Sequence, residues 1–192
     1  MTGSKRYKAV VIGSSAGGLN ALKTLFRGLD HRFRLPVIIV QHISPNSENY
    51  LIQILNELKK IKVKEADEKE KPVKGTAYIA PPNYHLLIEP DQTFTLTVDE
   101  RVNYARPSID VLFETAAEAY QDTLIGIILT GANNDGSSGL KRIKEFGGFT
   151  IVQDPDTAEV DSMPRAAILT TSVDKIMSIE EISAFLNTLD EN

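Results

Sequence analysis

Short, unbroken apolar runs alternate along this chain with segments whose apolar residues recur at helical spacing. The first run covers residues 9–12 (Ala-Val-Val-Ile), and a turn of small residues follows over 13–18. From residue 19 to 29, leucines and a phenylalanine recur every three or four positions. An unbroken apolar run indicates a strand buried on both faces of a sheet, and the helical spacing places the later apolar residues on one helix face. Residues 7–29 therefore predict a strand, a tight turn and a helix.

The rest of the chain repeats this alternation and predicts an α/β fold. Further strands are predicted at residues 36–41, 76–80, 124–129 and 149–153 and around Val173. Helices are predicted at 50–58, 109–120, 140–146, from 162 and over 179–189. Ser108 is expected to cap the helix at 109–120, and Ser178 with Glu181 to form a capping box on the helix at 179–189. The charged stretch 59–74 predicts a solvated helix end with a short edge strand. Residues 85–89 and 93–98 predict a β-hairpin. The predicted architecture is a doubly wound, mostly parallel sheet with helices on both faces and an inserted antiparallel hairpin.

Composition narrows the classes of protein and of site. The 192 residues, 42% of them hydrophobic, predict one domain over 1–192 with a sizeable core. The chain has no cysteine, which rules out disulfides, cysteine-ligated metals and a thiol nucleophile, and its three scattered histidines predict no metal site. A net charge of −5 argues against nucleic acid as a partner. Without a signal peptide or a long apolar run, the chain is expected in the cytoplasm, with no membrane insertion.

The turn after the first strand fits G-x-S-x-G, the pattern of a nucleophile elbow, with Ser15 at its centre. A dinucleotide site would need a glycine at that position and an acidic residue at the end of the second strand. The second strand instead ends in His42. Serines in such turns also cap helices or bind anions. The pair of Ser15 and His42 nonetheless favours acyl chemistry over nucleotide binding.

The ends of the predicted strands carry the side chains that acyl transfer requires. Ser15 follows the first strand, His42 the second, and Asp135 and Asp154 follow two later ones. Ligands of open α/β sheets bind at the carboxyl ends of the strands, so these residues are expected to gather there. A hydroxyl, an imidazole and a carboxylate can together form a catalytic triad. Spacing alone does not separate the two aspartates.

Two further histidines and two arginines receive structural interpretations. His31 lies in a charged loop and is expected to face solvent, whereas His85 opens the hairpin and is expected to make a structural hydrogen bond. Arg101 and Arg106 precede a helix cap and could meet an acidic partner, but ordinary surface salt bridges are the simpler expectation.

With these residues in view, the chain resembles the catalytic domain of the chemotaxis protein-glutamate methylesterases (CheB type). The resemblance runs from about Lys8 to Leu189 and is carried by the segments 13–18, 40–42, 78–86, 106–113, 129–136 and 153–164, in the family's order. It implies Ser15 as nucleophile, His42 as general base, Asp135 as the third member of the triad, and Asp154 near the site but outside the triad. It also implies hydrolysis of glutamyl methyl esters on the cytoplasmic helices of methylated chemoreceptors, with glutamine deamidation in many members, and no metal or organic cofactor.

Two local departures and one architectural departure from the family accompany this resemblance. Ala16 stands where the family usually has threonine, so a backbone N–H there is expected to serve the oxyanion without a side-chain contact. Ala132 and Asn133 replace the usual Met-Gly pair, which is expected to alter the pocket. The family's enzymes usually carry an N-terminal receiver domain, and none lies within 1–192, so the chain is either an excised domain or a stand-alone member. A separate receiver or regulatory protein is a further candidate partner. The alternatives are an esterase or amidase with another substrate, or a non-catalytic regulatory module.

Overall fold

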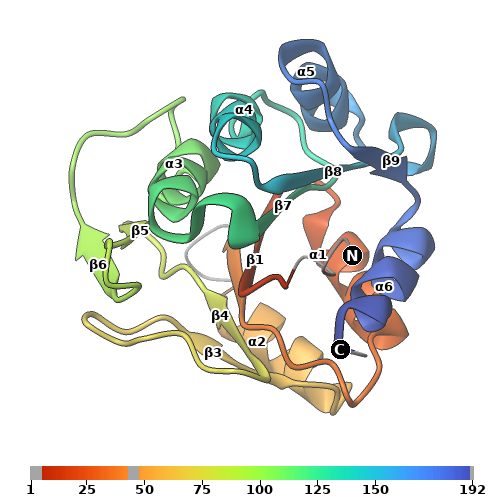
Figure 1. Ribbon diagram of the computed structural model, residues 1–192, viewed down its shortest axis with the longest axis horizontal. Helices are drawn as coiled ribbons and strands as arrows, with labels where there is room; N and C mark the ends of the chain where they lie inside the picture. Colours follow the sequence, from red (N-terminus) through yellow and green to blue (C-terminus); the bar gives the residue numbers. More distant parts are fainter. Residues whose placement is uncertain (1–5, 43–47, 191–192) are drawn as a thin grey trace, which may run out of the picture.

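A seven-stranded parallel sheet forms the centre of the computed structural model, which describes residues 6–42 and 48–190 (Figure 1). The strand order is β3-β4-β2-β1-β7-β8-β9, and every neighbouring pair is parallel. The bounds are β1 (Ala9–Ser14), β2 (Val37–Gln41), β3 (Lys62–Glu65), β4 (Thr76–Ile79), β7 (Leu124–Ile128), β8 (Phe149–Gln153) and β9 (Lys175–Met177). The predicted doubly wound α/β fold is confirmed.

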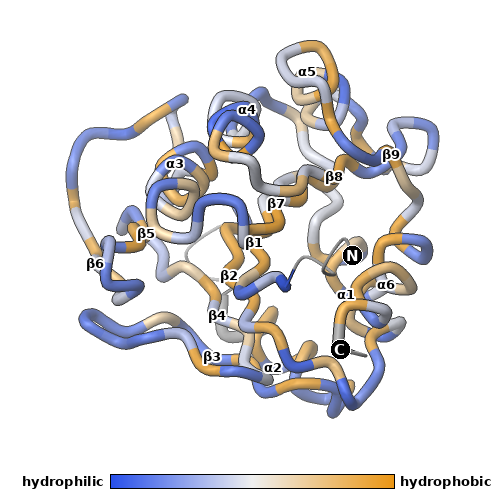
Figure 2. The backbone as a smooth tube through the Cα atoms, in the orientation of Figure 1, coloured by the Kyte–Doolittle hydropathy of each residue, from blue (hydrophilic) through white to orange (hydrophobic). Residues whose placement is uncertain are grey.

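Helices cover both faces of the sheet because apolar side chains of each central strand alternate between them. Val10 and Ile12 of β1 pack with one group of helices, and Val11 packs with the other. The first group is α1 (Gly18–Gly28), α2 (Glu48–Glu57) and α6 (Ile179–Asn187), and the second is α3 (Ile109–Tyr120), α4 (Ser137–Glu145) and α5 (Ser162–Thr170). Figure 2 shows the resulting apolar centre between polar outer helix faces. None of these helices is long and apolar enough to cross a membrane.

The smaller elements follow the sequence pattern closely, with one exception. The predicted hairpin is present as the antiparallel pair β5 (His85–Ile88) and β6 (Phe94–Thr97), a separate sheet beside α3. Short 3₁₀ helices complete the chain as η2 (Gln121–Thr123), η3 (Pro155–Thr157) and η4 (Thr188–Asp190). The capping box of Ser178 and Glu181 is confirmed.

The strand predicted around Val173 is present, but it begins two residues later, at Lys175. The carboxylate of Asp174 accepts hydrogen bonds from the backbone and hydroxyl of Thr150, both at 2.9 Å. The Asp174 N–H also donates to the Thr150 carbonyl at 3.0 Å, and Val173 packs against the core. The residues paired with β8 begin at Lys175, which is opposite Ile151.

The direction in which the chain winds reverses at β1. From β1 the chain moves to β2 and β4 on one side, and later returns to β7, which pairs with the other side of β1. The loops after β1, β2 and β7 consequently meet at one edge of the sheet, at the switch point where open α/β sheets bind ligands.

Candidate active site

The turn after β1 is held tightly against the end of β2. The side chain of Gln41 accepts a hydrogen bond from Ser14 Oγ and donates one to the carbonyl of Ser15 at 2.8 Å. Gly17 has φ +78°, a left-handed conformation that favours glycine. A Cβ at Gly18 would lie 1.8 Å from Gln41 Oε1. The small residues of this turn thus allow the close approach that fixes Ser15 at the edge of the sheet.

Ser15 and His42 lie next to each other because their strands are paired in register. Ser14 of β1 is opposite Gln41 of β2, and the His42 N–H donates to the Ser14 carbonyl at 3.0 Å. Neighbouring strands lie about 4.8 Å apart, so the next residue of each chain starts from adjacent positions. Both side chains line a pocket of about 410 Å³, together with Arg101, Asn103, Tyr104, Ala105, Arg106, Pro107 and Asn133.

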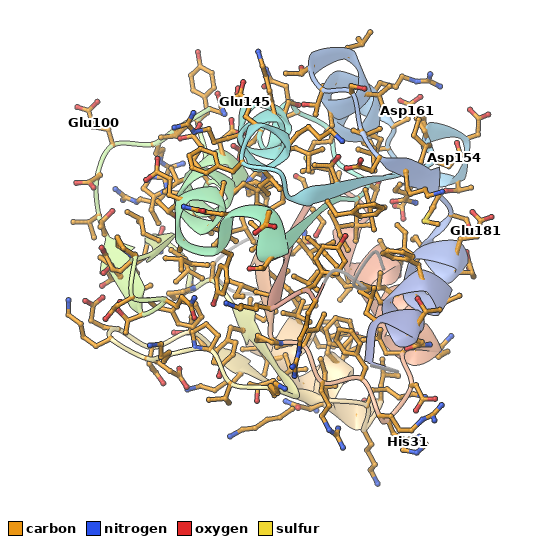
Figure 3. All side chains as sticks on the ribbon, viewed as in Figure 1. His31, Glu100, Glu145, Asp154, Asp161 and Glu181 are labelled. Carbon is orange, nitrogen blue, oxygen red and sulfur yellow. The ribbon has the colours of Figure 1, made fainter. Side chains whose placement is uncertain are left out.

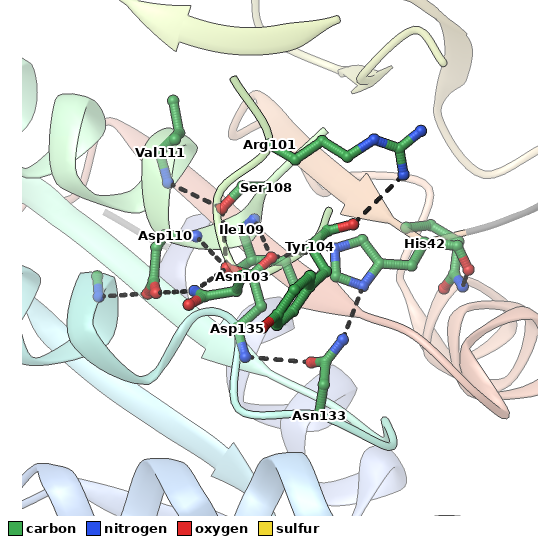
Figure 4. A network of polar contacts seen from close by, with 12 residues as sticks. His42, Arg101, Asn103, Tyr104, Ser108, Ile109, Asp110, Val111, Asn133 and Asp135 are labelled. Carbon is green, nitrogen blue, oxygen red and sulfur yellow. Dashed lines mark hydrogen bonds and ion pairs between the residues drawn. The ribbon is translucent and has the colours of Figure 1, made fainter. Parts of the chain in front are cut away.

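Asp135 reaches the same edge from the loop after β7 and lies fully buried at the N-terminus of α3 (Figure 4). Its Oδ2 accepts the Ile109 N–H at 2.7 Å, and its Oδ1 accepts the Asp110 N–H at 3.1 Å. Oδ1 also accepts from Ser108 Oγ at 2.8 Å and from Asn103 Nδ2 at 3.1 Å. The carboxylate therefore satisfies backbone donors at a helix start, where negative charge is favourable.

Those donors keep the buried carboxylate ionised. Burial by itself would raise the pKa of Asp135. The close contact with His42 and the hydrogen bonds from the Ile109 N–H, Asn103 and the Asp110 N–H outweigh it and hold that pKa below its usual value. The neighbouring Asp110 responds in the opposite direction: burial, together with the nearby charge of Asp135, raises its pKa. Asp135 is thus the more strongly ionised of this carboxylate pair.

The ring of His42 lies between Asp135 and Asn133. Its Nε2 is 3.0 Å from Asp135 Oδ2, and the imidazole side chain is 15% exposed. Although the two atoms are close, Nε2 makes no hydrogen bond of good geometry with any described residue. On the other side of the ring, Nδ1 is 3.3 Å from Asn133 Nδ2. An imidazole contacting a buried carboxylate beside a serine can exchange protons with that serine.

Ala16 directly follows Ser15, which lines the pocket. The Ser15 N–H donates to the Thr130 carbonyl at 3.0 Å and so is already satisfied. We find no acceptor for the Ala16 N–H within residues 6–42 and 48–190, and Ala16 itself is exposed. This N–H can therefore still donate to an oxygen of a bound molecule.

The second aspartate predicted for the site lies elsewhere. Asp154 Oδ1 accepts the Asp156 N–H at 3.0 Å and caps η3, near β9 in Figure 3. It is not among the residues that line the pocket. Only Asp135 of the two candidates contacts His42. Within the described ranges, no group of three or more His, Asp or Glu side chains lies together as a metal site would require.

The other two histidines adopt their expected structural roles, but the arginines do not. The side chain of His31 is 81% exposed. His85 is buried, with Nε2 2.9 Å from the Glu100 carbonyl. The salt bridges expected for Arg101 and Arg106 are absent among the described residues. Both guanidinium groups instead donate to backbone carbonyls of their own loop, and no carboxylate of the described residues pairs with their positive charge at the pocket.

Three residues that contact the site were not assigned to it from the sequence. Ser108 was predicted as a cap, which is confirmed by its bond from Val111, but its hydroxyl also donates to Asp135. Asn103 donates to both Asp110 and Asp135, and no sequence pattern marked it. Asn133 was noted only as a departure from the family. The position of Asn133 two residues before Asp135 was the one feature of the sequence that could have placed it in the site.

Comparisons with known proteins agree with this geometry. The family model described as CheB methylesterase matches residues 10–186. A relative from Leptospira interrogans, named putative protein-glutamate methylesterase/protein-glutamine glutaminase, is 58% identical over 97% of this chain and 96% of its own length. A relative from Archaeoglobus fulgidus, named protein-glutamate methylesterase/protein-glutamine glutaminase, is 39% identical over 96% of this chain but only 55% of its own length.

The fold agrees as well. The crystal structure of the Thermotoga maritima CheB methylesterase catalytic domain superposes with a TM-score of 0.91. It is 34% identical to this chain, and the match covers 95% of this chain and 98% of that domain. Sequence and structure therefore lead to one conclusion: the chain belongs to the CheB methylesterase family.

Proposed function

We propose that this protein hydrolyses glutamyl methyl esters of chemoreceptors through a triad of Ser15, His42 and Asp135. One observation carries the proposal: a buried, ionised Asp135 contacts the ring of His42, which lines the same pocket as Ser15. A positioned carboxylate, an imidazole and a hydroxyl are the three groups that serine hydrolases use. The relatives named protein-glutamate methylesterase support the choice of substrate.

The first half of the reaction forms an acyl-enzyme. Ser15 Oγ attacks the ester carbonyl carbon while its proton passes to His42, and the carbonyl oxygen becomes an oxyanion facing the Ala16 N–H. The bond to the methoxy oxygen then breaks, and His42 returns the proton so that methanol leaves. Asp135 stays ionised throughout and stabilises the imidazolium by its charge.

The second half releases the product and restores the enzyme. Water attacks the acyl carbon, gives a proton to His42, and the Ser15–acyl bond breaks as that proton returns to Ser15 Oγ. The products are a glutamate side chain and free enzyme. The same sequence acting on a glutamine releases ammonia in place of methanol, which would account for the glutaminase part of the relatives' names.

The mouth of the pocket supports an acidic protein as partner. Arg101 and Arg106 present charges that no described carboxylate pairs with, and Tyr104 between them is 95% exposed. An unpaired positive rim attracts an acidic surface. We infer that methylated cytoplasmic receptor helices dock here, which places the activity in the cytoplasm. A separate receiver protein would be a regulator in this scheme.

The test is methanol release from a methylated receptor fragment by wild type and by Ser15→Ala. The expected loss is about a thousandfold or more, as for removal of a triad nucleophile. Ser138→Ala, at an exposed serine of α4, is the matched control and should keep full activity. Unchanged methanol release by Ser15→Ala would overturn the mechanism. If wild type hydrolysed small esters but not the methylated receptor fragment, the proposal that chemoreceptor esters are the substrate would be wrong.

A further inference from the structure

The amide of Asn133 has a defined orientation. Its Oδ1 accepts the Asp135 N–H at 3.1 Å, and a backbone N–H can only donate. The amide oxygen is therefore the atom that faces the backbone, and the NH₂ group is the one that faces His42 Nδ1 at 3.3 Å (Figure 4). A flipped amide would place two donors against each other at Asp135.

This orientation decides which nitrogen of His42 carries the proton. An NH₂ group can only donate, so His42 Nδ1 must offer its lone pair to Asn133. The neutral ring then holds its proton on Nε2, which faces the Asp135 carboxylate at 3.0 Å. Nδ1 is thus the unprotonated nitrogen, and it can act as a base when the proton of Ser15 takes the place of the Asn133 NH₂ group at its lone pair.

Asp135 contacts only one side of the ring, and Nε2 makes no hydrogen bond of good geometry with any described residue although Asp135 Oδ2 is 3.0 Å away. A second contact on the opposite side of the ring supplies the missing constraint. We propose that Asn133 is a positioning residue that holds His42 in the tautomer with an unprotonated Nδ1. The inference rests on the proposed function only in taking Nδ1 as the nitrogen that serves Ser15.

The same contact would act during proton transfer. Once Nδ1 takes a proton, it is a donor facing the donor NH₂ group of Asn133, and this arrangement is unfavourable. A glycine, the usual family residue at this position, could make no such contact. Asn133 thus influences which nitrogen of His42 carries the proton, which a glycine at this position could not do.

The tautomer can be measured directly by NMR on the full chain carrying ¹⁵N-labelled histidine. At about pH 8, where histidine is normally neutral, wild-type His42 should show a protonated Nε2 and an unprotonated Nδ1. Asn133→Ala removes the donor and should populate both tautomers. Asn133→Asp keeps an acceptor for the Asp135 N–H but presents only acceptors to the ring. It should leave a proton on Nδ1.

Asn134→Asp is the matched control, since it makes the same change at an exposed neighbouring asparagine. Its His42 signals should equal those of wild type, which separates the hydrogen bond from the added charge. Signals of His31 and His85 should be the same in every variant and report on the fold. Wild-type His42 with a proton on Nδ1, or identical His42 signals in wild type and Asn133→Asp, would overturn the proposal.

Turnover gives a second readout. Asn133→Asp should lower kcat for ester hydrolysis by about tenfold or more, because Nδ1 already holds a proton, while KM changes little. A change in KM alone would point to a role in substrate binding and contradict the positioning role. The NMR result needs no turnover, so failure of the esterase proposal would leave the tautomer measurement interpretable.

Discussion

Replacing Asp135 by asparagine should destabilise the fold as well as stop catalysis. The substitution keeps the shape of the side chain but exchanges one acceptor oxygen for an NH₂ group. In place of Oδ2, that group would oppose the Ile109 N–H and the proton on His42 Nε2. In place of Oδ1, it would oppose two fixed donors, the Asp110 N–H and Asn103 Nδ2. The first orientation is less costly because the imidazole can carry its proton on Nδ1 instead, and it leaves one backbone N–H of α3 without its acceptor.

The size of the effect follows from these contacts. A buried donor without a partner costs about 1–3 kcal/mol. Loss of the negative charge at the N-terminus of α3 adds about 0.5–1 kcal/mol. The free energy of unfolding of Asp135→Asn should therefore fall by about 2–4 kcal/mol at pH 7. Asp154→Asn is the matched control and should change it by less than about 0.5 kcal/mol, because asparagine also caps a helix well.

This difference should depend on pH. The pKa of Asp135 is lower in the folded protein than its usual value of about 3.9, so the folded state holds the carboxylate ionised more strongly than the unfolded state does. Its stabilisation is fully present above the unfolded pKa and is lost as the pH falls through the folded pKa. The gap between wild type and Asp135→Asn should stay constant from pH 7 to about 5 and narrow below about pH 4.

Urea unfolding followed by circular dichroism at a series of pH values measures this gap. A difference below about 0.5 kcal/mol at pH 7 would refute the account of Asp135 as the acceptor for α3. A difference in unfolding free energy between wild type and Asp135→Asn that stays unchanged down to pH 3 would refute the conclusion that Asp135 is ionised in the folded protein.

Two further substitutions test the supports of the site. Ser108→Ala removes both the cap of α3 and a hydrogen bond to Asp135, so the free energy of unfolding should drop by about 1–2 kcal/mol. Ser138→Ala, measured in the same urea unfolding experiment, is the control. Equal stabilities of the two variants would contradict the role of Ser108 as both helix cap and donor to Asp135. Gly18→Ala would place a methyl group 1.8 Å from Gln41 Oε1, so it should cost about 1–3 kcal/mol and lower ester hydrolysis by displacing the support of Ser15. Full activity in Gly18→Ala would show that Gln41 does not position Ser15.

The sequence predicted those parts of the fold that depend on hydrophobic periodicity. Buried strands such as β1 are marked by unbroken apolar runs, and the alternation of strands with helices indicates a parallel sheet covered on both faces. The prediction near Val173 missed the start of β9 by two residues, and it could not show that the Asp174 carboxylate binds Thr150 of β8. No local pattern reveals a contact between residues that lie 24 positions apart.

The candidate site shows the same division. Strand ends identified Ser15 and His42, since position at a sheet edge can be read from the apolar runs. The choice between Asp135 and Asp154 needed the resemblance to the family, because both follow strands in turn sequences. Asn103 and Asn133 could not be assigned, because an asparagine side chain has a function only through the partners that folding brings to it. The expected effect of Asn133 on the pocket is now a specific contact with His42.

The central claim is that Ser15 is a nucleophile activated by His42. Treating the folded protein with a serine-reactive phosphonate and locating the adduct by peptide mass spectrometry tests it most directly. We expect one adduct, on Ser15, in wild type, and labelling slowed by about a hundredfold or more in His42→Ala, because the general base is lost. An unlabelled Ser15 in folded wild type, or equal labelling rates in wild type and His42→Ala, would contradict the claim.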